Sequence, residues 1–306
     1  MPHAGQLEGF IDCAHSLERV KLPPRQGAFS CLNEGASKMK ISHLIAASFL
    51  FCHSSMHAQD LTYQQLITRD GVKQGFAFQQ AADPVASAVL FQGGDGRIGA
   101  FGSERKGWVR NDAAFLSGGA GRFADTGISA AAFDTPSDRR NLNSGFRSTV
   151  EHAQDAAAVM DFLRKKAPGK PVCLIGTSNG SLSATSAAAL INEQGPDCIV
   201  LTSSVTVKPK SAVVARFAHV FTDADLSKIK VPVLIVHHKN DLCEHTPYAP
   251  MLVHTKSFPN SPKVDLITIE GGQDHSDNCN RGHHQFLGIE REVTVQIADW
   301  IKSLGK

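Results

Sequence analysis

The sequence predicts an α/β fold with a mostly parallel, doubly wound sheet, on the evidence of two patterns. Short apolar segments at residues 86–92, 171–175 and 231–236 alternate along the chain with segments of helical periodicity. These apolar segments also lack the alternation of polar and apolar residues that marks a strand with one face in water. Strands covered on both faces by helices form parallel sheets, in which functional groups gather beyond the carboxyl ends of the strands.

The other elements follow from periodicity and turn residues. A hairpin is expected where Arg69-Asp70-Gly71 separates two strands, because this turn sequence is typical of hairpins. The expected strands are residues 62–68, 76–79, 86–92, 127–133, 171–175, 198–202, 231–236 and 264–270, and the expected helices are residues 149–166, 179–192, 212–219, 223–228 and 290–303.

The composition is that of an ordinary globular protein and excludes some classes of partner. The chain has 306 residues, of which 42% are hydrophobic and 20% are charged, so it can bury a sizeable core. The 31 Lys and Arg residues nearly balance the 29 Asp and Glu residues, which leaves a net charge of +2. A nucleic-acid surface would need a basic cluster, so we expect no nucleic-acid partner. We also expect a monomer.

The N-terminal part predicts export. Met39-Lys40 is followed by an apolar run at residues 41–52 and by small residues up to Ala58. A basic start, a short apolar stretch and a small-residue exit are typical of a secretory signal peptide. The run is shorter than the about 20 residues that a membrane span needs, so no stable membrane span is expected. The alternative to a signal peptide is that the apolar run at residues 41–52 forms a buried core helix.

Three regions are therefore expected. Residues 1–38 are interpreted as a non-native or disordered extension upstream of a working start at Met39, residues 39–58 as the signal peptide, and residues 59–306 as one mature domain. The location is then periplasmic or secreted, where disulfides are permitted.

A nucleophile turn is the strongest chemical pattern. Gly176-Thr177-Ser178-Asn179-Gly180 follows an apolar strand and precedes a helix of small residues. Such a tight turn strains the serine backbone, and glycines on either side remove Cβ atoms that would clash. The Ser178 hydroxyl is thereby exposed, and the Asn179 amide can donate to an oxyanion. The alternative is an ordinary glycine-rich connection with an idle serine.

A serine nucleophile needs a base, and the base needs an orienting acid. Asp241 follows the strand at residues 231–236, which puts it at the functional edge of the sheet; the alternatives are a turn aspartate there and Glu244 as the acid. The base is expected after the last strand, where position alone does not choose between His275, His283 and His284. His275 is flanked by Asp274, so a metal contact is its alternative role.

The glycine-rich segment Gln92-Gly93-Gly94-Asp95-Gly96 follows the strand at residues 86–92 and fits a second oxyanion donor, the amide of Gly94. A phosphate-binding loop is disfavoured, because no Gly-Lys-Ser/Thr follows.

Taken together, these residues resemble the α/β-hydrolase family over residues 61–304, in the order nucleophile, acid, histidine. More narrowly, the chain resembles exported bacterial serine hydrolases in which a cysteine follows the acid and a second one precedes His-x-Phe-x-Gly-x-Glu. Here these are Cys243, Cys279 and the stretch from His284 to Glu290. The resemblance implies that His284 is the base. The family's His-Gly-Phe is His-Gln-Phe here, so Gln285 is expected to reshape the pocket beside the base.

The same resemblance implies a Cys243–Cys279 disulfide that ties the acid loop to the histidine loop. Cys173 and Cys198 lie in apolar strands and are interpreted as small core residues. Only about thirty residues separate the strands at 198–202 and 231–236, so little or no lid domain is expected. Residues 102–126 are expected to form one wall of an open site instead.

The expected function is that of a secreted carboxylesterase-like serine hydrolase, which forms an acyl-enzyme on Ser178 and acts on a small-molecule ester or peptide-like substrate. It needs no metal and no organic cofactor. The alternatives are a serine peptidase of the oligopeptidase or aminopeptidase kind and a catalytically idle scaffold of the same fold.

If residues 39–58 are a signal peptide, the protein exported by a bacterial host that expresses the full chain begins near residue 59. Intact-mass spectrometry of the exported protein measures this directly. A mature protein that still begins at residue 1 or 2 would contradict the export hypothesis.

Overall fold

A computed structural model describes residues 60–98, 114–116, 118–191, 193–208 and 219–305. The predicted extension (1–38) and signal peptide (39–58) lie outside these residues, as do nearly all of the predicted helix at 212–219 and much of the predicted wall at 102–126. Within the described part of the chain, eight strands form one sheet in the order β1-β2-β4-β3-β5-β6-β7-β8. The bounds are β1 Thr62–Arg69, β2 Val72–Gln79, β3 Ala86–Phe91, β4 Ile128–Pro136, β5 Val172–Thr177, β6 Cys198–Thr202, β7 Val233–His238 and β8 Val264–Ile269.

The strand pairing confirms the predicted α/β fold with a mostly parallel sheet. β1, β2 and β4 pair antiparallel, and every pair from β4 through β3 to β8 is parallel. The hairpin at Arg69–Gly71 is present, but β2 begins at residue 72 rather than 76 because Lys73 and Gln74 pair with Ile67 and Leu66 of β1. Cross-strand hydrogen bonds therefore extend a strand whose first residues are too polar to indicate one.

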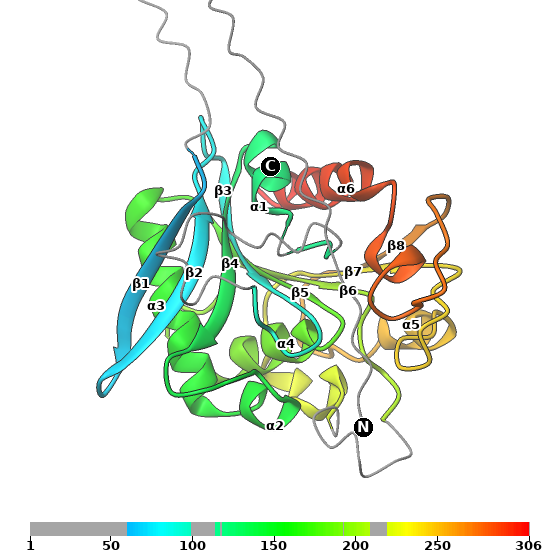
Figure 1. Cartoon of the computed structure of the whole chain (residues 1–306), viewed down its shortest axis with the longest axis horizontal. Helices are drawn as coiled ribbons and strands as arrows, with labels where there is room; N and C mark the ends of the chain where they lie inside the picture. The colour runs from blue at the N-terminus through cyan, green and yellow to red at the C-terminus, as the bar shows by residue number, and fades with distance from the viewer. Residues whose placement is uncertain (1–59, 99–113, 117, 192, 209–218, 306) are drawn as a thin grey trace, which may run out of the picture. The chain divides into compact units, whose positions relative to one another are not determined.

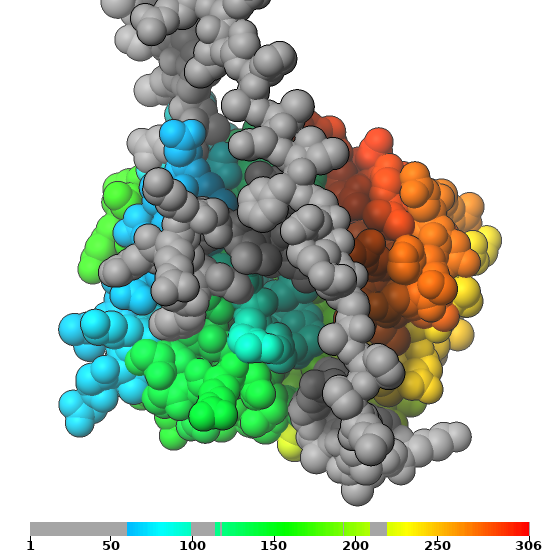
Figure 2. Space-filling view, viewed as in Figure 1, coloured from blue at the N-terminus to red at the C-terminus, as the bar shows by residue number. Residues whose placement is uncertain are grey.

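Helices cover both faces of the sheet (Figure 1). One face carries α3 (Val150–Lys166) and α4 (Gly180–Leu190), and the other carries α1 (Ala120–Asp125) and α6 (Glu290–Ser303). α3 begins where predicted because the Thr149 side chain accepts a hydrogen bond from the His152 amide, which satisfies one free N–H of the first turn. In the space-filling view the first hairpin and the C-terminal elements lie at opposite sides (Figure 2).

Several short elements differ from the prediction or were not predicted. Residues 223–228 do not form one helix: the structure has two 3-10 helices, η2 (Phe221–Asp223) and η3 (Leu226–Lys228). Helices α1, α2 (Ser144–Arg147) and α5 (Ala249–His254) span too few turns to show helical periodicity in the sequence. No helix in the described residues has the length and apolarity needed to cross a bilayer.

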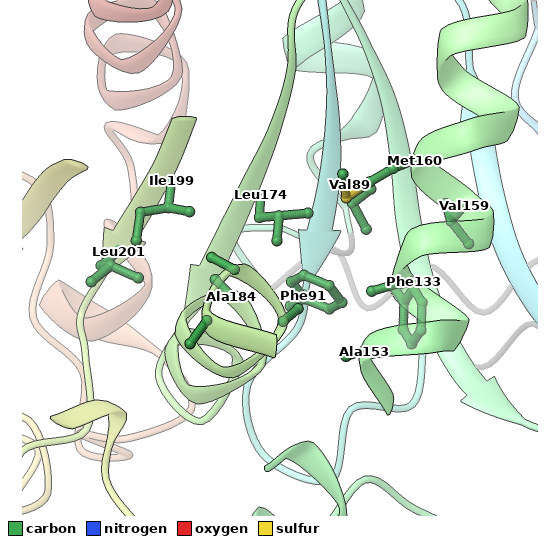
Figure 3. Packing of buried hydrophobic residues seen from close by; sticks show 14 of the residues in the cluster. Val89, Phe91, Phe133, Ala153, Val159, Met160, Leu174, Ala184, Ile199 and Leu201 are labelled. Atoms are coloured by element: carbon green, nitrogen blue, oxygen red, sulfur yellow. The ribbon is translucent and has the colours of Figure 1, made fainter. Parts of the chain in front are cut away.

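The core between the sheet and the α3–α4 layer is formed by large side chains of the sheet and small ones of α4. Phe91 and Phe133 pack with ring centroids 5.0 Å apart, and Ala184 of α4 lies close beneath the sheet (Figure 3). α4 is almost entirely buried and consists mainly of Ala and Ser. Small residues let this helix approach the strands closely, and this approach positions the turn that precedes it.

The prediction that Cys173 and Cys198 are no more than small core residues is wrong, because the structure joins them in a disulfide. They are register partners on the neighbouring parallel strands β5 and β6, with Cα atoms 4.7 Å apart. That separation lies within the range for disulfides. Both residues are buried in the core, as expected.

His152 on α3 is a fully buried histidine that no chemical pattern indicated. Its ring packs against Phe91, Phe133 and Phe146, and neither ring nitrogen has a hydrogen-bond partner. Burial, and secondarily the charge of Arg147, lowers the pKa of His152 to about 3. The ring is therefore neutral in the folded protein at every pH above about 3.

This predicts a loss of stability in mild acid. Between pH 6.5 and 3 the unfolded chain binds a proton at His152 that the folded chain does not bind. The free energy of unfolding therefore falls as the pH falls, by up to about 1.4 kcal/mol per pH unit. His152→Leu should remove this part of the slope between pH 5 and 6.5 in urea denaturation. His219→Leu, at a side chain that is 43% exposed, is the control; an equal slope in wild type and His152→Leu would contradict the assignment.

Candidate active site

Ser178 lies in the turn between β5 and α4 with a backbone φ of 53°, in the left-handed region. Its amide donates to the Thr202 carbonyl (3.0 Å), and its own carbonyl accepts from the Ser181 amide (3.0 Å) and hydroxyl (2.6 Å). A non-glycine residue holds this conformation only when its surroundings enforce it, and such residues cluster at active sites. Ser178 is partly exposed, whereas its neighbours in the turn are buried.

The glycines around Ser178 are required by close contacts with backbone atoms and with the Ser178 side chain. A Cβ on Gly176 would lie 2.1 Å from the Gly180 carbonyl oxygen, and one on Gly180 would lie 2.0 Å from the Phe91 carbonyl oxygen. A Cβ on Gly93 would lie 2.7 Å from the Ser178 Cβ. The segment after β3 therefore runs directly against the serine.

Asp241 and His284 form a buried pair at the same edge of the sheet. Asp241 follows β7, and His284 lies in the 3-10 helix η4 (Gly282–Gln285). His284 Nδ1 lies 2.9 Å from Asp241 Oδ2, and neither side chain is exposed. The Ser203 hydroxyl, at the end of β6, donates to the His284 carbonyl (2.8 Å) and so anchors η4 to the sheet.

The other candidates for acid and base lie elsewhere. His283 approaches the Asn240 carbonyl (3.1 Å), and His275 accepts from the Asp277 amide (2.9 Å). Glu244 is 84% exposed and lies beside His245. Of the three candidate bases His275, His283 and His284, only His284 is hydrogen-bonded to Asp241.

Two partners of Asp241 were missed by the sequence analysis. The Thr246 hydroxyl donates to Asp241 Oδ2 (2.9 Å) and lies 3.0 Å from His284 Nδ1, and His237 Nε2 lies 3.4 Å from the same carboxylate oxygen. The Cys243 amide donates to Oδ1 (2.9 Å). Burial alone would raise the pKa of Asp241, but hydrogen bonds from His237 and His284 outweigh it and hold the pKa well below its ordinary value. The carboxylate is therefore ionised and can stabilise a protonated imidazole.

The contact between base and nucleophile is not formed in this structure. His284 Nε2 is buried without a hydrogen-bond partner, and no hydrogen bond joins it to the Ser178 hydroxyl. Hydrogen bonds of this kind are often long in ligand-free sites and tighten when substrate binds.

A buried arginine holds the segment that carries Gly94. Arg147, which has no exposed surface, donates to the carbonyls of Gln92 (3.0 Å) and Gly94 (3.4 Å) and to the Ser183 hydroxyl (2.7 Å). Asn179 Nδ2 also donates to the Gly94 carbonyl (3.3 Å). Burial lowers the pKa of Arg147 to about 9, although the charge of Asp95 opposes this shift. The sequence offered no sign of this role, because an arginine at the end of a short helix resembles a surface residue.

A cavity of about 270 Å³ opens beside Ser178. The residues lining it include Gln92, Gly94, Arg97, Ser178, Asn280 and Gln285. A larger cavity of about 660 Å³ is lined by Pro171, Asp197 and Pro232, which precede β5, β6 and β7. It therefore lies at the opposite ends of these strands, away from Ser178.

Cys243 and Cys279 form a disulfide between the segment that follows Asp241 and the segment that precedes His284. Among the described residues, no group of three or more His, Cys, Asp or Glu side chains is arranged to hold a metal ion. His275, for which a metal contact was the alternative, belongs to no such group.

No family model and no curated protein sequence matches the chain, but solved structures do. Est1E from Butyrivibrio proteoclasticus matches with a TM-score of 0.53 and 17% identity, over 81% of this chain and 100% of that chain. An esterase from Pyrococcus furiosus matches with a TM-score of 0.56 and 14% identity, over 80% and 91%. A dienelactone hydrolase from Anabaena variabilis matches with a TM-score of 0.53 and 13% identity, over 81% and 98%. The chain thus has the α/β-hydrolase fold, with a likeness to bacterial esterases and dienelactone hydrolases.

The disulfide between the two loops predicts a measurable loss of stability. Cys243→Ala should lower the free energy of unfolding by about 3–4 kcal/mol, because the bridge closes a loop with a sequence separation of 36. Urea denaturation of oxidised protein measures the change. The Cys243→Ala/Cys279→Ala double variant is the control, and it should lose about the same amount because either change removes the bridge. Unchanged stability in both variants would count against the bond.

Proposed function

We propose that the chain is a serine hydrolase that cleaves a carboxylic ester through an acyl-enzyme on Ser178. The observation that carries this proposal is the buried, hydrogen-bonded Asp241–His284 pair at the sheet edge where Ser178 is held in a left-handed turn. The fold shared with esterases supports the same reaction class, and a structure of Est1E with ferulic acid bound shows a small carboxylic acid held by a protein of this fold.

In the proposed reaction, Ser178 Oγ attacks the ester carbonyl carbon while His284 Nε2 takes the hydroxyl proton. The tetrahedral intermediate collapses when His284 returns that proton to the departing alcohol, which leaves an acyl-serine. Water then attacks the acyl-serine by the same proton transfers and releases the acid. Because Nε2 has no partner in the folded protein, it is available for both transfers.

The remaining residues have supporting roles in this mechanism. Asp241 orients His284 through Nδ1 and stabilises the imidazolium, and its low pKa keeps it ionised throughout. The amides of Gly94 and Asn179 donate to the oxyanion; losing one such donor typically costs about 10²–10³ in rate. Arg147 fixes the carbonyls of Gln92 and Gly94 and thereby holds one of these donors in place.

We also infer that the protein acts outside the cytoplasm. Two disulfides, Cys173–Cys198 and Cys243–Cys279, support this inference because disulfides persist mainly in oxidising compartments. The signal peptide proposed at residues 39–58 provides the route.

The test of the proposed function is hydrolysis of p-nitrophenyl esters. We expect Ser178→Ala and His284→Ala to reduce kcat/KM by at least about 10⁴-fold, and Asp241→Asn by about 10⁴-fold through the wrong imidazole tautomer. His275→Ala is the matched control and should retain activity. Loss of activity in His275→Ala with retention in His284→Ala would overturn the assignment of the base.

A fluorophosphonate probe and an amide substrate separate the alternatives. The wild type should be labelled at Ser178, and an unlabelled wild type would indicate a catalytically idle scaffold. Aminoacyl p-nitroanilides that are cleaved faster than the esters would indicate a peptidase instead.

A further inference from the structure

The side chain of Gln285 is a buried amide that faces the candidate active site. It is only 4% exposed, it follows His284 directly in η4, and it lines the cavity that contains Ser178. Its Oε1 accepts a hydrogen bond from the Phe115 amide (2.9 Å). A backbone N–H can only donate, so this contact identifies the atom facing Phe115 as the carbonyl oxygen of the side chain.

The same contact determines where the amino group of Gln285 is left. Once Oε1 faces Phe115, Nε2 is the other end of a planar amide, and it makes no hydrogen bond to any described residue. Phe115 is itself immobilised, since its side chain is fully buried and packs edge-on against Phe286 (4.9 Å). The amide therefore cannot turn over without breaking the bond to Phe115. Because Gln285 lines the cavity beside Ser178, this N–H is available to a bound molecule.

The rest of the cavity has the same polar character. Asn280 and the ion pair of Arg97 with Asp95 (2.7 Å) line it together with Gln285. Its volume of about 270 Å³ is smaller than the roughly 300–1,000 Å³ of sites for drug-sized ligands. A long hydrocarbon chain would leave the amino group of Gln285 without a partner, whereas a short group with an oxygen acceptor would give it one.

We propose that Gln285 is a specificity-determining residue that donates Nε2–H to an acceptor oxygen of the substrate. The preferred substrates are small esters that carry an ether, hydroxyl or carbonyl oxygen in addition to the scissile ester, rather than esters of purely hydrocarbon acids and alcohols. This inference rests on the proposed esterase function and deepens it.

The experiment compares esters of nearly equal size that differ by one oxygen. p-Nitrophenyl methoxyacetate and p-nitrophenyl butyrate test the acyl side, and 2-methoxyethyl acetate and butyl acetate test the alcohol side. Dividing each variant's kcat/KM ratio by that of the wild type cancels the different intrinsic reactivities of the two esters. A merely structural role would lower kcat/KM for both members of a pair and leave their ratio unchanged.

Two substitutions isolate the donor. Gln285→Glu keeps an oxygen for the Phe115 amide and replaces the amino group with a second oxygen, while Gln285→Leu removes both polar ends. Each should lower the oxygen-to-hydrocarbon ratio about fivefold to tenfold in one of the two pairs, which also identifies the side of the ester that Gln285 contacts. Gln273→Glu, at an exposed position of the same loop, is the control for added charge and should keep the wild-type ratio.

The outcomes separate this inference from the function on which it rests. Wild-type ratios in both Gln285 variants and both ester pairs would overturn the role of Gln285 while the esterase proposal stands. A wild-type protein that hydrolyses none of the four esters would overturn both.

Discussion

The close approach of α4 to the ends of β3 and β5 is the constraint on which the site depends. The Gly180 Cα lies so near the Phe91 carbonyl that a Cβ would be only 2.0 Å from its oxygen. A helix this close leaves no room for a relaxed connection, so Ser178 turns through the left-handed region and its side chain is partly exposed. The small residues of α4 make the approach possible. Core packing and the geometry of the candidate nucleophile therefore have one cause.

A second constraint is the balance of charge around the buried Asp241. A buried carboxylate is costly unless it is hydrogen-bonded. This one accepts hydrogen bonds from Thr246, His284 and the Cys243 amide, and His237 Nε2 lies 3.4 Å from it. These partners come from β7, the segment after it and η4, so satisfying one carboxylate fixes three parts of the chain relative to each other. The Cys243–Cys279 disulfide adds a covalent link between the segment after β7 and the segment that precedes η4.

The sequence allowed prediction of the features that depend on local chemistry. The spacing of Gly176 and Gly180 around Ser178 indicated the turn, because the steric reason for those glycines lies within a few residues. The apolar strands likewise indicated the parallel sheet, because the lack of polar–apolar alternation within each strand shows that both of its faces are covered. The choice of His284 over His275 came from a family resemblance, since spacing along the chain does not say which loop residue reaches Asp241.

Features that depend on tertiary contacts were out of reach. Arg147 and Thr246 make hydrogen bonds to residues far away in sequence, Arg147 to Gln92 and Gly94 and Thr246 to His284. The residues next to them in the sequence therefore do not reveal these roles. The Cys173–Cys198 disulfide requires that two strands pair in one register, and register is not readable from either strand alone. His152 was missed because a lone histidine on a helix shows no sign of being enclosed by phenylalanine rings.

The candidate site is marked by its polar side chains rather than by the size of its cavity. A larger cavity than the one beside Ser178 lies at the far ends of the strands, where Pro171, Asp197 and Pro232 line it. At the near ends, the buried Nε2 of His284 has no hydrogen-bond partner, and the next residue, Gln285, lines the cavity beside Ser178. Each side chain is fixed by a hydrogen bond at its other end, to Asp241 and to the Phe115 amide. In the proposed reaction, the Ser178 hydroxyl supplies the donor that His284 Nε2 lacks, and a substrate oxygen supplies the acceptor for the Nε2–H of Gln285. On this argument, substrate binding and the completion of the hydrogen bonding around η4 are the same event.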